Sequence, residues 1–383
     1  MRLSERERAA TIAVYPQLDL APVRAAGVYI ETADGRRVLD LYGGHAVAVL
    51  GYGHPALTAA IAEQAATMLF QSNAVALAER AEAAEKLVAF APDGLDRAFF
   101  VNSGGEANDN ALRIACMVTG RHRVVALEHA FHGRTAAASA VTWGSHERWY
   151  GFPRTPFDVT FVPRDDAAAA IREIGDDVAA VIVEPIQGVA GAYDLDPDYL
   201  HALAAAARAA GALLIADEVQ CGMGRSGHAF AIEAAGVTPD ILTGAKSLGG
   251  GVPCAAVLVP ADLAGELKPG DLGSTFGGGP LAARAISTVI DTINTQQLLA
   301  HVRRVSAEIR ERCMTGPVQS IQGSGFMLGL VLDRPAAGVR DALLSHDILT
   351  GTSADPSVLR LLPPLILESS HVDRLATALA EME

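Results

Sequence analysis

Short apolar runs recur through the middle of this chain, and helical patterns separate several of them. Each run is bounded by glycine, charged or other turn-forming residues, which is typical of buried strands. The runs cover residues 99–101, 124–127, 159–162, 178–183, 213–216, 241–243 and 255–259, and helical patterns cover 109–118 and 197–210. Strands that alternate with helices predict an α/β fold with a mostly parallel, doubly wound sheet.

The length of the chain predicts more than one domain. With 383 residues it is too long for one simple core. We expect residues 46–284, which hold the strand-like runs, to form a large domain. The pattern then changes to a long helix over 281–299 and to short strands such as 327–332. Residues 285–383 and the N-terminal segment 1–45, which has a hairpin pattern around Asp34-Gly35, are expected to form a smaller α+β domain.

The net charge and the cysteine pattern limit which binding partners and which cellular compartment we expect. The formal net charge of −14 argues against nucleic acid or an anionic membrane as a partner. Arg208 and Gly211 interrupt the longest apolar stretch, and no apolar segment follows the charged N-terminus, so we expect neither a membrane span nor a signal peptide. Four scattered cysteines without metal-ligand spacing predict a reduced, cytoplasmic protein with no metal site: Cys116, Cys221, Cys254 and Cys313.

Two of the strand-like runs end in residues that can do chemistry. One run ends in Asp217, and the next along the chain ends in Lys246, which a glycine triplet soon follows. Ligands of open α/β sheets bind beyond the carboxyl ends of the strands, so the acid and the amine would share one crevice. A lysine that forms a Schiff base and a carboxylate that keeps a pyridine nitrogen protonated suit pyridoxal phosphate. The alternative is that Asp217 caps a helix and Lys246 is a surface amine.

Three further motifs add groups that a phosphorylated aromatic cofactor needs. The glycine turn in Asn102–Asn108 opens a helical pattern, and the N-terminus of a helix favours phosphate. The motif Phe-His-Gly-Arg-Thr over 131–135 offers an aromatic face and a cation, and the loop 273–278 offers hydroxyl groups. No single motif is specific, whereas their order along the chain is highly specific.

In that order the chain resembles the class III (ω-amino acid) aminotransferases of the fold type I pyridoxal phosphate enzymes. It is most similar to the branch of acetylornithine and LysW-aminoadipate-semialdehyde aminotransferases. Supporting segments are Gly-Tyr-Gly-His-Pro at 51–55, Ala-Val-Thr-Trp at 140–143 and Arg-Leu-Leu-Pro-Pro-Leu at 360–365. The resemblance implies amino transfer between glutamate or 2-oxoglutarate and an ω-amino or semialdehyde substrate, free or bound to a carrier protein. It also implies a homodimer with shared active sites.

The resemblance implies which residues hold the cofactor. Lys246 would form the Schiff base and move the proton, and Asp217 would pair with the pyridinium nitrogen. The residues implied around the ring are Phe131 and Val219 on its two faces, His132 next to Phe131, and Gln220 at the 3′ oxygen. Those implied around the phosphate are Ser103, Gly104, Gly105 and, from the partner subunit, Thr275. The family commonly has a side chain where Gly105 stands, so backbone N–H groups would carry more of the phosphate binding.

Substrate recognition is where the chain departs from the family it resembles. Arg134 would bind a distal carboxylate, and Arg360 the α-carboxylate of glutamate or 2-oxoglutarate. Acetylornithine-type enzymes have a glutamate that shields the second arginine, and Val189 stands in its place here. Glu184 precedes that position and is expected to be a structural carboxylate of the substrate region rather than a replacement.

Other functions are compatible with parts of this pattern. Fold type I chemistry also includes decarboxylases, racemases and aminomutases. Residues 222–227 spell G-x-G-x-x-G with Asp240 beyond them, as in a nicotinamide oxidoreductase, but polar residues separate these glycines from the preceding strand. A third alternative is a noncatalytic regulator or carrier-protein partner, and the retention of Lys246, Asp217 and Arg360 argues against it.

Overall fold

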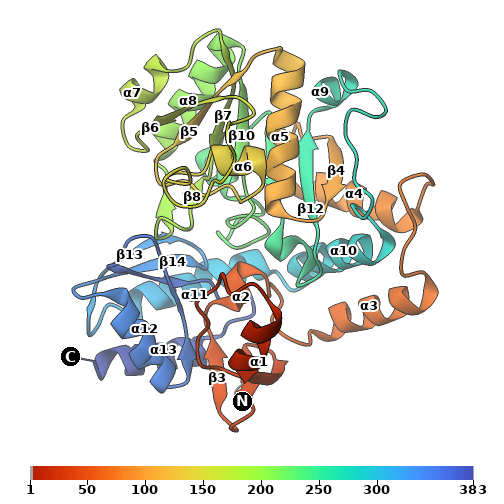
Figure 1. Ribbon diagram of the computed structural model, residues 1–383. Coiled ribbons are helices and arrows are strands. Elements are labelled where there is room, and N and C mark those ends of the chain that lie inside the picture. Colours follow the sequence, from red (N-terminus) through yellow and green to blue (C-terminus); the bar gives the residue numbers. More distant parts are fainter. Residues whose placement is uncertain (1–2, 383) are drawn as a thin grey trace.

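A seven-stranded sheet forms the centre of the computed structural model, which describes residues 3–382 (Figure 1). The strand order is β4-β12-β11-β10-β7-β5-β6. Its strands are β4 (Arg97–Val101), β5 (Arg123–Leu127), β6 (Asp158–Val162), β7 (Val178–Val183), β10 (Leu213–Asp217), β11 (Ile241–Gly244) and β12 (Ala255–Val259). All of the predicted runs in the middle of the chain therefore form strands of one sheet, and the predicted α/β fold is confirmed.

The sheet is mostly parallel and is covered on both faces. Only β12 runs against its two neighbours, β4 and β11. Every residue of β7 is buried, because successive side chains point to opposite faces and each face has its own layer. Val181 packs in the core that contains α8 (Pro197–Ala210), and Ile182 packs in the core that contains α5 (Gly104–Thr119).

Local sequence signals explain why α5 begins at the edge of the sheet where strands end. Ser103 precedes the helix in an extended conformation, and its hydroxyl accepts a hydrogen bond from the N–H of Glu106 at 3.2 Å. Gly120 ends the helix in the left-handed conformation at φ 67°. The helix buries a face of small and apolar residues that includes Ala107, Ala111, Leu112 and Ala115. This packing directs the N-terminus of α5 toward the carboxyl ends of the parallel strands.

Two smaller sheets lie outside the central one. The first has the order β1-β2-β3-β15 and the second β13-β14-β17-β16. Their strands are β1 (Pro22–Ala26), β2 (Tyr29–Thr32), β3 (Arg37–Asp40), β13 (Val318–Ser324), β14 (Met327–Leu332), β15 (Ile348–Leu349), β16 (Gly351–Thr352) and β17 (Val358–Leu361). The predicted hairpin is β2 paired with β3, and β15 adds a parallel strand from the other end of the chain. Figure 1 accordingly shows β3 beside the C-terminal elements.

This pairing supports a small domain built from both ends of the chain, but the boundaries 1–45, 46–284 and 285–383 stay predictions. Residues 1, 2 and 383 of those segments lie outside the described part. The predicted long helix over 281–299 is wrong in its length. Helix α10 (Pro280–Thr295) ends earlier, and α11 (Leu298–Arg312) begins after Gln297, whose φ of 52° cannot continue a right-handed helix.

The remaining elements are mostly short or peripheral. The helices are α1 (Leu3–Ala10), α2 (Gly43–Ala46), α3 (Pro55–Thr67), α4 (Ala78–Phe90), α6 (Ala136–Ala140), α7 (Ala167–Arg172), α9 (Ala261–Gly265), α12 (Ala336–Ser345) and α13 (Ser369–Ala380). Two short strands and two 3₁₀ turns complete the list: β8 (Ile186–Gln187), β9 (Tyr193–Asp194), η1 (Ala231–Ala235) and η2 (Lys246–Gly249). Across residues 3–382, no helix has the length and apolar character needed to cross a membrane.

Candidate active site

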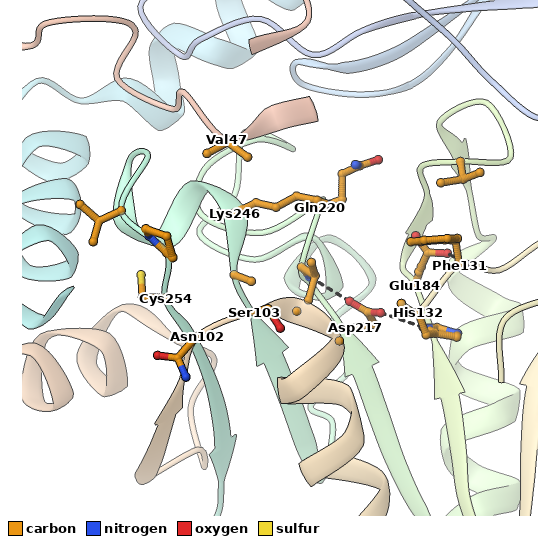
Figure 2. A pocket seen from close by; sticks show the side chains of 18 of the residues that line it. Val47, Asn102, Ser103, Phe131, His132, Glu184, Asp217, Gln220, Lys246 and Cys254 are labelled. Atoms are coloured by element: carbon orange, nitrogen blue, oxygen red, sulfur yellow. Dashed lines mark hydrogen bonds and ion pairs between the residues drawn. The ribbon is translucent and has the colours of Figure 1, made fainter. Parts of the chain in front are cut away.

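Asp217 and Lys246 meet at the carboxyl ends of two neighbouring parallel strands. Asp217 is the last residue of β10 and lies opposite Thr243 of β11, three residues before Lys246. Both side chains line one cavity of about 350 Å³ (Figure 2). The predicted shared crevice is therefore present, and Lys246 is a half-buried residue of its wall rather than a surface amine.

Most of the residues predicted for the site line this cavity. They are Ser103, Gly104, Gly105, Phe131, His132, Glu184, Val189, Asp217, Val219, Gln220 and Lys246. The other three do not line it. Arg360 is buried beside it, while Arg134 and Thr275 are exposed. The guanidinium carbon of Arg134 lies 5.2 Å from the centre of the Phe131 ring.

Hydrogen bonds fix the carboxylate of Asp217 from three directions. Its Oδ2 lies 2.7 Å from His132 Nδ1 and accepts a hydrogen bond from Asn108 Nδ2, also at 2.7 Å. Its Oδ1 accepts a bond from the N–H of Val219 at 3.0 Å. An ionised carboxylate only accepts, so the proton of a neutral His132 belongs on Nδ1. The buried Nε2 of His132 is then an acceptor, and it has no partner among the described residues.

Asn108 is a member of this network that sequence reasoning missed. Its Nδ2 also donates to the carbonyl of His132 at 2.7 Å, and its Oδ1 accepts a bond from the hydroxyl of Thr243 at 2.7 Å. One side chain of α5 thus connects Asp217 of β10, Thr243 of β11 and the loop of His132. The available signal was a polar residue on the buried face of α5, next to Ala107 and close to Ala111.

Lys246 is placed so that its amine loses a proton more readily than usual. Burial lowers its pKa, and Arg360 lowers it further, while Asp217 and Glu184 oppose the change. Its backbone is left-handed, with φ 46°, which is rare outside glycine. Such strain persists only where the surrounding structure enforces it, and it concentrates at functional sites.

Glu184 ties two walls of the cavity together. Its Oε1 accepts a hydrogen bond from the N–H of Phe131 at 2.8 Å, and its Oε2 accepts one from the N–H of Gly188 at 3.3 Å. Burial raises the pKa of this carboxyl to about 7, while nearby His132 opposes the shift. In residues 3–382 Glu184 makes no ion pair with Arg360, and its expected role as a structural carboxylate stays a prediction.

The guanidinium of Arg360 is buried among neutral acceptors. It donates to the carbonyl of Thr352 at 2.8 Å, the carbonyl of Gly188 at 3.1 Å and the hydroxyl of Tyr42 at 2.7 Å. Gly351 leaves the space for Tyr42, since a β-carbon there would lie 1.9 Å from the Tyr42 ring. Burial lowers the pKa of Arg360. Within the described chain no carboxylate pairs with it, so it remains available to an anionic ligand.

Comparison with known proteins places this arrangement in a family. The family model described as aminotransferase class-III matches residues 12–382. The chain belongs to the class III aminotransferases. The acetylornithine aminotransferase of Streptomyces coelicolor is 41% identical over 383 residues, which cover 98% of this chain and 94% of that protein. The acetylornithine aminotransferase of Methanocaldococcus jannaschii is 37% identical, over 96% of this chain and 94% of its own length.

Solved structures of other aminotransferases agree with this family assignment. The ornithine aminotransferase of Toxoplasma gondii superposes with a TM-score of 0.92 at 27% identity, over 99% of this chain and 93% of that one. Its structure has pyridoxal phosphate in partial occupancy at the active site. A transaminase of the marine bacterium Virgibacillus, 24% identical, has the same fold with a TM-score of 0.92, over 99% of this chain and 98% of its own. The protein is therefore a pyridoxal phosphate-dependent transferase of fold type I.

The residues present in the aminotransferase fit this cofactor. Phe131 and Val219 both line the cavity, so an aromatic ring could lie between them. Gly104 lets the N-terminus of α5 approach closely, since a β-carbon there would lie 2.6 Å from Val219. The first N–H groups of α5, that of Gly105 included, could hold the phosphate. Gly105 offers no side-chain donor, and a β-carbon there would lie 3.2 Å from the hydroxyl of Thr135.

The dinucleotide alternative has no comparable site. The glycine-rich segment 222–227 forms turns between β10 and η1 and does not open a helix, so it offers no helix N-terminus to a pyrophosphate. Across residues 3–382 no group of three His, Cys, Asp or Glu side chains is arranged to hold a metal ion.

Proposed function

We propose that this enzyme transfers an amino group from glutamate to a semialdehyde of the acetylornithine type, and the reverse. The observation that carries the proposal is one cavity that contains Lys246, the Asp217 network and, at its side, an Arg360 without a carboxylate partner. The Streptomyces coelicolor and Methanocaldococcus jannaschii relatives are acetylornithine aminotransferases, which supports the substrate class. Pyridoxal phosphate supplies an electron-accepting ring when it is bound.

Each cavity residue then has a defined task. Lys246 holds the cofactor and moves the proton through its Nζ, which a lowered pKa makes available as a free base. Asp217 keeps the ring nitrogen protonated, and Asn108 and His132 hold its carboxylate in place. Gln220 lines the same cavity and would hold the 3′ oxygen of the bound cofactor.

Two guanidinium groups suit the two carboxylates of glutamate. Arg360 would bind the α-carboxylate, because an anion there replaces weak neutral contacts with a charge-assisted pair. Arg134, which extends over Phe131 and makes no ion pair within residues 3–382, would bind the distal one. Val189 lines the cavity near Arg360 and offers no charge to either substrate.

The enzyme is proposed to act as a cytoplasmic homodimer in which each subunit completes the other's site. Thr275 is exposed and lies outside the cavity of its own chain, as a residue that serves a partner's phosphate site would. Next to it Phe276 is 65% exposed and its ring contacts that of Phe70, and a subunit interface would cover this apolar surface. The described cysteines are all free thiols, as in a reducing compartment.

Absorbance of the cofactor tests the reaction directly. Mixing the loaded enzyme with glutamate should convert it to the amino form, and an acetylornithine-type semialdehyde should convert it back. A panel of free amines and then a carrier-bound amine, tested in the same way, identifies the preferred partner. Release of carbon dioxide or racemised glutamate instead of amino transfer would favour the other fold type I reactions.

A further inference from the structure

Residues 43–46 form a left-handed turn that includes two residues other than glycine. The φ angles are 53° at Gly43, 58° at Gly44, 64° at His45 and 68° at Ala46. Left-handed backbone costs an L-residue roughly 1–2 kcal/mol. A strained histidine that the surrounding structure enforces is therefore a candidate for a functional role.

The surrounding structure does enforce this turn. Asp40 accepts hydrogen bonds from the N–H of Tyr42 at 2.8 Å and of Gly43 at 2.9 Å. At the other end, the carbonyl of Ala46 accepts a bond from the hydroxyl of Ser247 at 2.8 Å. Because Ser247 follows Lys246 directly, the turn is fixed to the element that carries the reactive amine.

The turn places the imidazole of His45 beside Tyr42, which is a direct neighbour of Arg360. The ring packs against Tyr42 with centroids 4.7 Å apart, and the Tyr42 hydroxyl accepts a bond from Arg360. The rest of the imidazole is exposed, and its nitrogens form no hydrogen bond within residues 3–382. Tyr42 therefore contacts both His45 and Arg360, and neither imidazole nitrogen of His45 has a hydrogen-bond partner within residues 3–382.

Cations from three separate parts of the chain surround this histidine. Partial burial lowers the pKa of His45, and Arg360, Lys246 and Arg134 lower it further, while Asp40 opposes them. These groups and the Tyr42 ring are the titratable and charged neighbours that act on it. These effects hold the pKa of His45 below the ordinary value for histidine in the free enzyme.

We propose that His45 is a substrate-binding residue, which hydrogen-bonds a carboxylate of a dicarboxylate seated between Arg134 and Arg360 and takes up a proton as that substrate binds. The inference rests on the proposed function, because it needs a dicarboxylate amino acid or oxo acid as one substrate. A bound dianion offsets the surrounding cations and raises the pKa of His45, so the complex binds a proton that the free enzyme lacks. Binding therefore strengthens as pH falls toward the ordinary pKa of histidine and loses this contribution at higher pH.

Glutarate is a suitable probe, since it carries both carboxylates but neither an amino nor a keto group. Titration calorimetry on the cofactor-loaded enzyme, in two buffers of different ionisation enthalpy at about pH 6.5 and about pH 8.5, gives both Kd and proton uptake. The informative variant is His45→Asn, because asparagine tolerates left-handed backbone. The control is His129→Asn, which alters another exposed histidine with φ 66° that packs on an aromatic ring, Trp143.

We expect wild type and His129→Asn to take up protons with glutarate near pH 6.5. His45→Asn should lose this uptake and bind about tenfold more weakly there, with a smaller difference near pH 8.5. Equal proton uptake and Kd in wild type and His45→Asn would overturn the proposal. Failure of glutarate to bind wild type would also overturn it.

A separate experiment tests the proposed function: the conversion of the bound cofactor to its amino form by glutamate. Conversion in wild type together with unchanged proton uptake in His45→Asn would refute only the role of His45. Cofactor absorbance and the thermal unfolding midpoint of each variant show whether it is folded and loaded. If His45→Asn is not folded, His45→Gly, which removes the strain, takes its place with the same expected outcomes.

Discussion

His132 Nδ1 lies 2.7 Å from Asp217 Oδ2, and this buried contact forms part of the wall of the cofactor cavity. It joins the end of β10 to the loop after β5, so the carboxylate cannot turn without moving the wall that carries Phe131. Asn108 holds the same oxygen from α5. Strand β10, the loop after β5 and helix α5 together therefore fix the orientation of the Asp217 carboxylate.

Lys246 should be the residue that carries the cofactor. Borohydride reduction of the purified enzyme followed by peptide mapping should find the pyridoxyl group on Lys246, the only lysine that lines the cavity of the described chain. Asp217→Ala should retain the reducible bond but lose nearly all amino transfer, because the ring nitrogen is no longer held protonated. A pyridoxyl group on Lys86 or Lys268 would refute the assignment.

Asn108→Ala should slow amino transfer without removing the cofactor. It leaves Asp217 Oδ2 without one of its donors, and a hydrogen bond to a charged group is worth about 1.5–3 kcal/mol, or roughly 10- to 150-fold in rate. Rapid-mixing absorbance with glutamate measures the effect. The control is Asn110→Ala on the same helix, whose amide bonds only the carbonyl of Glu106. Equal rates in both variants would show that Asn108 does not position the carboxylate.

Val189→Glu should shift preference toward ω-amines. Among the described residues no carboxylate forms an ion pair with Arg360, so it is a buried cation whose cost an α-carboxylate relieves and a bare methylene does not. A glutamate there should raise the ω-amine half-reaction relative to the glutamate one by about 1–3 kcal/mol, or roughly 5- to 150-fold in the ratio.

Val189→Gln is the matched control, because glutamine has nearly the same shape as glutamate but carries no charge. It should leave the ratio of the two half-reaction efficiencies near that of wild type. An unchanged ratio in Val189→Glu, with cofactor content preserved, would mean that this position does not set specificity.

The buried carboxyl of Glu218 should make stability depend on pH. Burial raises its pKa to about 7, although Cys221 and the N–H of Ile232 donate to it. The folded state therefore holds a proton that the unfolded chain releases at lower pH, so the free energy of unfolding falls as pH rises from about 4.5 to about 7.

Glu218→Gln removes this proton linkage. Denaturant unfolding at about pH 5 and about pH 8 should show that wild type loses up to about 3 kcal/mol relative to the variant, since one pKa unit is about 1.4 kcal/mol. A constant difference between the two proteins across this range would contradict the raised pKa.

Mixed dimers should recover activity if Thr275 serves the partner's site. Lys246→Ala and Thr275→Ala are each expected to be weak or inactive alone. In a mixed dimer one site has both defects and the other has neither, so partial activity should return. No recovery, under conditions in which tagged subunits demonstrably exchange, would argue that each site is built from one chain.

Local sequence patterns were enough to predict the central sheet and the two reactive residues. The apolar runs are short-range signals. Asp217 follows one of them directly and Lys246 follows another within three residues, so their place at the sheet edge needed only the parallel order of strands. The helix break at Gln297 was not predictable in this way. It is a change in the backbone of one polar residue inside a continuous helical pattern.

The sequence by itself thus determined the fold class, the cofactor chemistry and most of the residues that line the cavity. Only the tertiary structure decided which partners hold those residues. Asn108 reaches Asp217 across 109 positions of sequence, and Arg360 reaches Tyr42 across 318, because packing of α5 on the sheet and of β17 near the N-terminal turn brings them together. Such contacts depend on three-dimensional geometry and leave no periodic signal in the chain, which is why His45, Tyr42 and Asn108 emerged only from the structure.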